Sequence, residues 1–344
     1  MQTGAQTAVN LRLVKGIVPA RASGDNMLAW GYSVFGLIIL LISGDALIKG
    51  AVNLSLRLGV PALIISLTIV AFGTSAPELL IAIQATLEDA PGLALGNVVG
   101  SNTANILLVL GVPALLFSLD TTQCAPCVTY LFMLFSSLVF IALAATGVFD
   151  VWQAAILLAL LAVYLYKNFK DATDQSVTSE CGMVDPDDEL EGADPSLPSW
   201  KIGAYLAVGL IGLPVGADLL VDSATEIARR YHVSDAVIGL TLVAIGTSLP
   251  ELATTVMSAY RKQADVALGN VIGSNIFNLL AIVGVAALVD EISVPRDFVH
   301  FDLWIMFAAS LLIAPFVFLS WKIGRIGGTV LTALYVLYVL SVLH

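Results

Sequence analysis

The stretch VAFGTSAPELL at residues 70–80 returns as VAIGTSLPELA at residues 243–253, and this duplication decides the fold. A second stretch, ALGNVVGSNTANILLVLGVPAL at 94–115, returns as ALGNVIGSNIFNLLAIVGVAAL at 267–288. Both stretches are displaced by the same number of positions, which relates Glu78 to Glu251 and Asn102 to Asn275 and is called the repeat offset below. Similarity at one fixed offset indicates that the chain contains two copies of a single structural unit.

The composition of the chain places both copies in a lipid bilayer. Of its 344 residues, 58% are hydrophobic and 12% are charged, and its mean hydropathy is +0.93. Ordinary water-soluble domains are less apolar, and a membrane-spanning helix needs about 20 predominantly apolar residues. Such runs recur from Leu28 to Leu343. The sequence therefore predicts an all-α membrane protein with many spans.

Apolar runs and the residues that interrupt them predict ten transmembrane helices. The chain then divides into an N-terminal tail (1–27), a first five-helix repeat (28–170), an acidic cytoplasmic linker (171–200) and a second five-helix repeat (201–344). Because each repeat has an odd number of spans, the second should be inverted in the membrane, as in many secondary transporters. The predicted spans are 28–48, 60–86, 92–117, 126–147, 151–169, 201–223, 234–259, 265–289, 299–320 and 326–343.

Loop charges predict the orientation. Lys and Arg gather in the loops on the same side as the linker, and cytoplasmic loops are the ones enriched in these residues. We therefore expect both termini outside, although the basic tail, with Arg12, Lys15 and Arg21, argues the other way. The tail lacks the apolar core of a cleavable signal peptide. We expect a multi-pass protein of the plasma membrane, which is the inner membrane in a bacterium.

Two glutamates lie inside apolar spans. Glu78 and Glu251 occupy the predicted second and seventh spans, where an acidic side chain at the bilayer centre costs at least about 2.5 kcal/mol. The second, third, seventh and eighth spans contain no Lys or Arg. Because the sequence supplies no fixed countercharge there, we expect the neutralising partner to be a mobile cation or proton.

Each glutamate follows the string Gly-Thr-Ser-x-Pro. Pro77 and Pro250 have no N–H to donate to a helical carbonyl, so we expect the second and seventh helices to be kinked or unwound there. The freed carbonyls would join hydroxyls and a carboxylate on one helix face, and such oxygens are the hard ligands that calcium and sodium prefer. The predicted faces are Ala71, Thr74, Ser75 and Glu78 in the first copy and Ala244, Thr247, Ser248 and Glu251 in the second.

The next helix in each copy adds polar residues one turn apart. Ser101 and Asn105, and equivalently Ser274 and Asn278, place their side chains on one face. Such residues also join membrane helices through hydrogen bonds, but their duplication beside the glutamates favours an ion site near the membrane midplane. Two carboxylates are neutralised by one calcium ion, by two sodium ions or by two protons. Competition for one site therefore predicts exchange.

Asp45 and Asp218 are related by the same offset. They lie near the ends of the predicted first and sixth spans. Solvation at the membrane interface or a hydrogen bond between helices is the expected role of a carboxylate in such a place.

The strings GTSAPE with GNVVGSNTAN, and GTSLPE with GNVIGSNIFN, resemble the two alpha repeats of the calcium/cation antiporter superfamily, which includes the sodium/calcium exchangers and their microbial relatives. The resemblance implies a ten-helix fold in which the first and sixth helices slide across the ions during alternating access. It also implies that Glu78 and Glu251 bind calcium with the backbone carbonyls of Thr74 and Thr247. The implied sodium ligands, beside the glutamates, are Ala71, Thr74, Ser75, Ser101, Ala244, Thr247, Ser248 and Ser274.

One position departs from the family pattern. Asn278 stands where sodium/calcium exchangers often carry an aspartate opposite the equivalent of Asn105, so the site is one carboxylate poorer. This departure leaves the counter-ion and the stoichiometry open, and potassium co-transport, which accompanies that aspartate, is not expected. Proton/calcium exchangers carry a glutamate early in the third helix, where this chain has Gly96-Asn97-Val98-Val99. The pattern is nearer the sodium branch.

These observations predict a secondary-active antiporter that exchanges calcium for sodium, with a calcium/proton antiporter of the same fold as the alternative. A cation channel could use the same ligands but would not need paired inverted breaks. An enzyme is not expected, because Ser75 and Ser248 have no His or Lys near them in sequence. We expect no cofactor, no ATP, since a phosphate-loop motif is missing, and no nucleic-acid partner, since the net charge is −11. A monomer is the working expectation.

Overall fold

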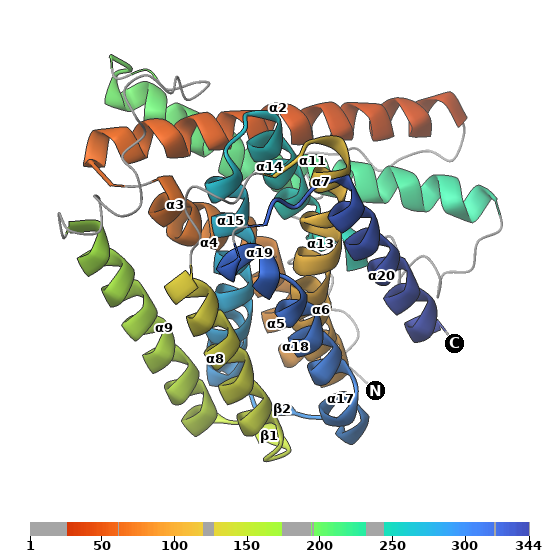
Figure 1. The fold of residues 1–344 in the computed structure, drawn as a ribbon. Helices are drawn as coiled ribbons and strands as arrows, with labels where there is room; N and C mark the ends of the chain where they lie inside the picture. The colour runs from red at the N-terminus through yellow and green to blue at the C-terminus, as the bar shows by residue number, and fades with distance from the viewer. Residues whose placement is uncertain are drawn as a thin grey trace.

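The protein is described by a computed structural model at residues 26–60, 62–119, 127–173, 194, 196–231, 244–319 and 321–343, and these residues are predominantly helical (Figure 1). The first copy contains α2 (Asn26–Leu58), α3 (Ala62–Ile65), η1 (Ser66–Val70), α4 (Ala71–Thr74), α5 (Ala76–Leu87), α6 (Pro91–Ala104), η2 (Asn105–Val109), α7 (Gly111–Leu116), α8 (Cys127–Ala144) and α9 (Val151–Thr173). The second contains α11 (Ser199–Arg230), α13 (Ala244–Thr247), α14 (Leu249–Tyr260), α15 (Ala264–Phe277), η4 (Asn278–Ile282), α16 (Val283–Val289), α17 (Arg296–His300), α18 (Asp302–Leu312), α19 (Ala314–Phe318) and α20 (Arg325–Leu343). The elements η1, η2 and η4 are π-helical turns.

Among the described residues, seven helices are long and apolar enough to cross a membrane. The bent pair Ala62–Thr74 and Ala76–Leu87 makes an eighth if it counts as one span, and Arg325–Ser341 is apolar but shorter. Every predicted span contains a described helix, although part of the seventh, residues 234–243, lies outside the described residues. The all-α class is confirmed. The number of ten spans and their inversion stay predictions.

The duplication extends to the backbone. Helices α5 and α14, helices α6 and α15, and π-turns η2 and η4 all begin and end exactly one repeat offset apart. The described non-glycine residues with positive φ are Asp89 (53°) and Lys262 (57°), which occupy equivalent positions in the turn before the third helix. Because such a backbone conformation is uncommon outside glycine, its recurrence shows that the two copies fold alike.

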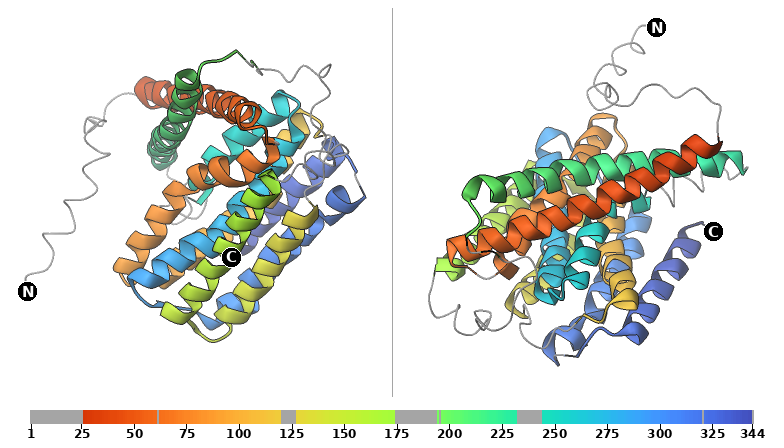
Figure 2. Two further views of the ribbon diagram at one scale, coloured as in Figure 1. Left: turned by 90° about the vertical axis from the view of Figure 1, so that its left-hand side faces the viewer. Right: turned by 90° about the horizontal axis from the view of Figure 1, so that it is seen from above.

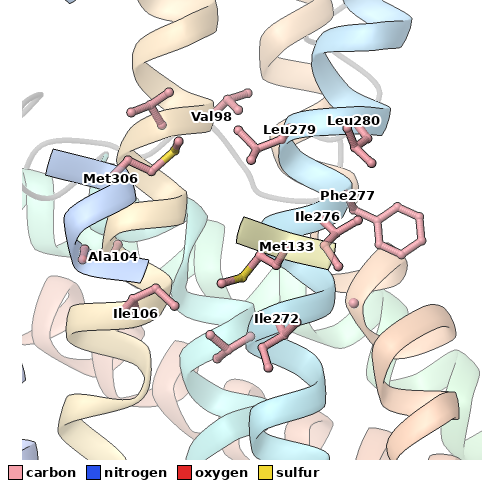
Figure 3. Packing of buried hydrophobic residues seen from close by; sticks show 14 of the residues in the cluster. Val98, Ala104, Ile106, Met133, Ile272, Ile276, Phe277, Leu279, Leu280 and Met306 are labelled. Atoms are coloured by element: carbon pink, nitrogen blue, oxygen red, sulfur yellow. The ribbon is translucent and has the colours of Figure 1, made fainter. Parts of the chain in front are cut away.

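The third helix of each copy lies at the centre of the molecule. In their most apolar windows, 78% of the span Pro91–Leu116 and 89% of Ala264–Val289 are buried, against 28% for α2 and 22% for α11. Side chains from α6, α8, α15 and α18 meet there in a single apolar cluster (Figure 3). The cluster includes Val98, Ala104, Ile106, Met133, Ile272, Ile276, Leu279 and Met306.

Helices α2 and α11 lie together across one side of the other helices (Figure 2). Glycines allow them to cross closely: a Cβ added at Gly36 would lie 2.8 Å from Leu220 N, and one added at Gly209 would lie 2.8 Å from Leu47 Cα. Gly36 is equivalent to Gly209 and Leu220 to Leu47 under the repeat offset, so the two contacts are the same contact made in each direction. The crossing therefore follows a local two-fold symmetry, in which each copy makes the same contact to the other.

The ends of the two copies are joined by short strand pairings. Strand β1 (Val148–Phe149) pairs antiparallel with β2 (Ile292–Ser293), and an isolated bridge links Leu119 to Ile323. These pairings hold the loops after α7 and α16 to the opposite copy.

Candidate cation site

The helix that carries Glu78 breaks at Ser75. Ser75 has φ −84° and ψ 5°, where α4 ends and α5 begins, and the two segments are bent by 43°. Pro77 has no N–H, so the carbonyl of Gly73 loses its helical donor. The kink that the sequence predicts in the second helix is present. Ser248, with φ −88° and ψ 4°, divides α13 from α14 in the same way.

The two glutamates are completely buried. Glu78 is 1% exposed and Glu251 is 0% exposed. Glu251 Oε1 accepts a hydrogen bond from Ser75 Oγ of the other copy at 3.4 Å. Among the described residues, no hydrogen-bond partner meets either carboxylate oxygen of Glu78 or Oε2 of Glu251. Buried anionic oxygens without donors are costly, so the arrangement is suited to a positively charged ligand.

Hydroxyl groups of the two copies meet in two equivalent pairs. Thr74 Oγ1 lies 3.5 Å from Ser274 Oγ, and Ser101 Oγ lies 3.5 Å from Thr247 Oγ1. The repeat offset exchanges these pairs, which is the behaviour expected of a two-fold axis between the copies. The structure thus brings the predicted Thr74 of α4 and Thr247 of α13 against the predicted serines of the opposite third helix.

The remaining predicted residues are placed less uniformly. The carbonyl of Ala71 accepts from Ser75 N–H at 3.1 Å and from Thr74 Oγ1 at 3.3 Å, so part of its capacity is used. Ser248 Oγ is buried without a partner among the described residues. Ala244 begins α13, but its side chain lies outside the described part of the chain.

The predicted asparagines are also buried. Asn105 is 1% exposed and Asn278 is 0% exposed. Asn105 Nδ2 donates to Asn275 Oδ1 at 3.1 Å. Within the described residues, Asn105 Oδ1 and both amide atoms of Asn278 have no hydrogen-bond partner.

Sequence reasoning missed two further polar groups around the site. Asn270 Nδ2 donates to Thr254 Oγ1 at 2.9 Å, and its Oδ1 lies 3.5 Å from Thr74 Oγ1. Asn97 Nδ2 lies 3.5 Å from the carbonyl of Glu78. Both asparagines belong to the duplicated Gly-Asn-Val string, so the duplication itself was the signal that could have identified them.

Asp45 lies outside this arrangement. Its carboxylate is 2.9 Å from Lys49 Nζ and accepts from Arg261 Nε at 2.7 Å. Arg261 follows α14, so the pair joins two helices of different copies. Helix α2 continues to Leu58, which corrects the predicted position of Asp45 near a helix end.

The charge of the site comes from two carboxylates. The described residues contain no group of three or more His, Cys, Asp or Glu side chains that could hold a metal ion. The other polar groups buried around them carry neutral hydroxyl, amide and carbonyl oxygens, which suit hard cations such as Ca²⁺ and Na⁺ better than zinc or copper.

Comparisons with known proteins identify the family of the chain. The family model described as sodium/calcium exchanger protein matches residues 28–170 and again 201–343. The putative antiporter CaxA of Alkalimonas amylolytica is 33% identical over 319 residues, covering 86% of this chain and 90% of CaxA. The sodium/calcium exchanger MaX1 of Methanosarcina acetivorans is 32% identical over 345 residues, covering 90% of this chain and 97% of MaX1.

A solved structure is also similar. The sodium-calcium exchanger NCX_Mj, soaked with zero Na⁺ and Ca²⁺, superposes with a TM-score of 0.74 at 34% identity, covering 92% of this chain and 99% of NCX_Mj. The resemblance found in the duplicated strings is thereby confirmed, and the apolar helices are those of an integral, multi-pass membrane protein. The chain belongs to the sodium/calcium exchanger protein family, within the calcium/cation antiporter superfamily.

Proposed function

We propose that this protein is a secondary-active antiporter that exchanges Ca²⁺ for Na⁺ at the site between its two repeats. The proposal rests on the buried carboxylates of Glu78 and Glu251, three of whose four oxygens have no hydrogen-bond partner among the described residues. Two such anions in a membrane interior carry a cost of several kcal/mol. A bound cation would offset that cost, and no Lys or Arg of the surrounding spans can do so.

Calcium would lie between Glu78 and Glu251, with the backbone carbonyls of Thr74 and Thr247 as further ligands. Sodium ions would lie beside the glutamates and use Thr74, Thr247, the hydroxyls of Ser75, Ser248, Ser101 and Ser274, and the carbonyls of Ala71 and Ala244. The side-chain oxygens of Asn105 and Asn278 would serve either cation. The contacts between Ser75 and Glu251, and between Thr74 and Ser274, support a site built by both copies. The names of NCX_Mj and MaX1 support the choice of these two ions.

Exchange follows if only the loaded protein changes access. An empty site with two negative charges is too costly to dehydrate, so the switch between outward and inward access would require either one Ca²⁺ or two Na⁺. Charge balance favours two sodium ions for each calcium ion, because Asn278 supplies no third carboxylate. In this mechanism α2 and α11 slide across the site, and their close glycine crossing is compatible with such a movement.

The membrane arrangement is part of the same proposal. Ten spans form two inverted repeats, 28–170 and 201–344, which the acidic segment 171–200 links on the cytoplasmic side. Both termini then face outward from a plasma membrane, the inner membrane if the host is a bacterium. The constant repeat offset and the distribution of Lys and Arg support this topology.

Uptake of radioactive calcium into proteoliposomes tests the function. Vesicles with purified protein should accumulate calcium when sodium is trapped inside, and they should not do so without a gradient. Uptake driven only by a proton gradient would instead assign the protein to the calcium/proton antiporters. Calcium flux that needs no counter-ion would contradict antiport and favour a channel.

A further inference from the structure

Three buried asparagines connect the third helices of the two copies: Asn102 and Asn105 of the first copy are hydrogen-bonded to Asn275 of the second. These three and Asn278, the equivalent of Asn105, are each at most 1% exposed. Asn105 and Asn278 each begin a π-helical turn. Such turns shift the backbone hydrogen-bond ladder and are frequent at functional sites. The carbonyls of Asn102 and Asn275, which lie just before these turns, accept the backbone N–H groups of Asn105 and Asn278 as well.

Two of their hydrogen bonds obey the two-fold symmetry. Asn102 Nδ2 donates to the carbonyl of Asn275 at 3.2 Å, and Asn275 Nδ2 donates to the carbonyl of Asn102 at 3.4 Å. A main-chain carbonyl can only accept, so each side chain must turn its nitrogen toward it. The oxygen of each amide is then directed elsewhere. This reciprocal pair fixes the orientation of both side chains.

A third hydrogen bond breaks the symmetry. Asn275 Oδ1 accepts from Asn105 Nδ2 at 3.1 Å. Because the nitrogen of Asn275 is committed to the Asn102 carbonyl, Asn105 meets an acceptor and must present its own nitrogen. The oxygen of Asn105 is thereby turned away from Asn275, and it is buried without a partner among the described residues.

The equivalent bond in the other direction is not formed. Within the described part of the chain, Asn102 Oδ1 has no hydrogen-bond partner, and neither amide atom of Asn278 has one. Asn102 therefore does not orient Asn278. Asn102 and Asn275 make the same reciprocal bonds, but only Asn275 also binds, and so orients, a further asparagine of the opposite copy, Asn105.

Building on the proposed cation site, we propose that Asn275 is a positioning residue that holds the side-chain oxygen of Asn105 toward the cation. Asn105 lies one turn after Ser101, whose hydroxyl contacts Thr247 of the opposite copy. An amide presents either a ligand oxygen or a repelling NH₂ group to a cation. Asn275 decides between these two orientations, and Asn102 supplies only a structural bond.

The symmetry provides a matched pair of variants. Asn275→Leu and Asn102→Leu each remove one amide donor from an equivalent carbonyl, and both positions are buried; Asn102 loses in addition a weak contact at 3.7 Å to Met306 Sδ. Only Asn275→Leu also releases Asn105. We expect similar melting temperatures, an apparent KM for Ca²⁺ raised about tenfold in Asn275→Leu, as for loss of one buried hydrogen-bonded group, and little change in Asn102→Leu.

Substitutions of Asn105 itself test whether Asn275 acts through the orientation of the Asn105 amide. In Asn105→Asp either carboxylate oxygen can face the cation, so adding Asn275→Leu should not raise the KM further. In Asn105→Leu the ligand is absent, so the double variant should be no worse than the single one. Equal KM shifts in Asn275→Leu and Asn102→Leu, or additive shifts with Asn105→Leu, would overturn the proposal.

One further measurement and a second pair of variants cover the remaining outcomes. Calorimetric Ca²⁺ binding to detergent-purified variants tests Asn275 even if the wild-type protein does not exchange, so failure of the proposed function is distinguishable. If Asn275→Leu alone fails to fold, Asn275 is mainly structural and the proposal is overturned. If neither leucine variant folds, the smaller change to serine at both positions carries the same comparison.

Discussion

The seam between α2 and α14 differs from its symmetry equivalent between α11 and α5. In the first seam, the Asp45 carboxylate is paired with Lys49 and Arg261. The side chains of Asp45 and Arg261 are only 25% and 11% exposed. The residues equivalent to Asp45, Lys49 and Arg261 in the other seam are all acidic: Asp218, Asp222 and Glu88 respectively.

Packing shows the same contrast. A Cβ added at Gly44 of α2 would lie 3.1 Å from the carbonyl of Ala253, and Ala253 is 6% exposed. The equivalent residues are Ala217 and Leu80, and Leu80 is 69% exposed. Helix α2 is therefore docked on α14, whereas Leu80 of α5 is not covered in the same way.

The contrast teaches that duplication preserved the proposed ion ligands but not the contacts that flank them. In the proposed mechanism, the opposite access state would separate Asp45 from Arg261 and bring α11 toward α5, where the equivalent residues repel. The two access states then differ in free energy although the ion site is nearly symmetric. A bias of about 1.4 kcal/mol would correspond to a tenfold difference in population.

The largest effect is expected for the buried glutamate that both copies share, Glu78 in the first and Glu251 in the second. Glu78→Gln and Glu251→Gln should each reduce calcium exchange to the level of protein-free liposomes, because each removes half of the negative charge that binds Ca²⁺. Uptake into proteoliposomes measures this. Glu291→Gln, at an exposed residue between α16 and β2, is a control that should retain exchange. Normal transport in either of the first two variants would remove the proposed site.

The next effect concerns the pair Asn105 and Asn278. Asn278→Asp adds a third carboxylate to one copy, so we expect an additional monovalent cation per cycle and a dependence of exchange on membrane potential. Uptake under potentials clamped with potassium and valinomycin measures the charge moved. Asn278→Leu, which adds no charge, is the matched control. An unchanged charge per cycle in Asn278→Asp would count against our interpretation of this position.

Substitutions in the ion-paired seam between α2 and α14 should change transport less than the substitutions above. Asp45→Asn should lower the population of the state seen here, because a partly buried pair is worth about 1 kcal/mol, or about fivefold in the equilibrium. The ratio of the apparent KM values for Ca²⁺ on the two membrane faces reports this change. Arg261→Gln should give the same shift, and the double variant should not add to it.

Asp218→Asn is the symmetry-matched control for that seam. It removes one charge from the acidic group, so it should move the ratio in the opposite direction. Shifts of the same sign in Asp45→Asn and Asp218→Asn would show that the ratio reflects general destabilisation rather than the contrast between the seams.

The smallest effect is expected in the linker, which has no counterpart within either copy. Deleting residues 176–190 should leave the exchange rate within about twofold, because loop length is tolerated well thermodynamically. The contacts that hold the end of the linker against the first copy, Asp194 N–H to Asn53 Oδ1 at 2.9 Å and Arg57 to the Leu197 carbonyl at 3.3 Å, are retained. Complete loss of exchange would show that the acidic segment does more than connect the repeats.

The sequence by itself determined the membrane class, the duplication and the buried glutamates. Apolar composition and run length decide whether a helix can enter a bilayer, and a constant offset reveals a repeat without knowledge of its packing. The break at Ser75 was also predictable, because Pro77 cannot donate a backbone hydrogen bond wherever the helix lies. These properties are local to the chain.

Only the tertiary structure decided which residues meet across the copies. The contacts of Ser75 with Glu251, and of Asn102 with Asn275, join residues that are far apart in the sequence and belong to different copies. Helical spacing places Asn102 away from the face of Ser101, so its role follows from the opposite helix and not from its own. Likewise, the repeat offset related Asp45 to Asp218, but only packing showed that Asp45 also pairs with Arg261 of the other copy. Side-chain pairing depends on how distant surfaces dock, which no local pattern records.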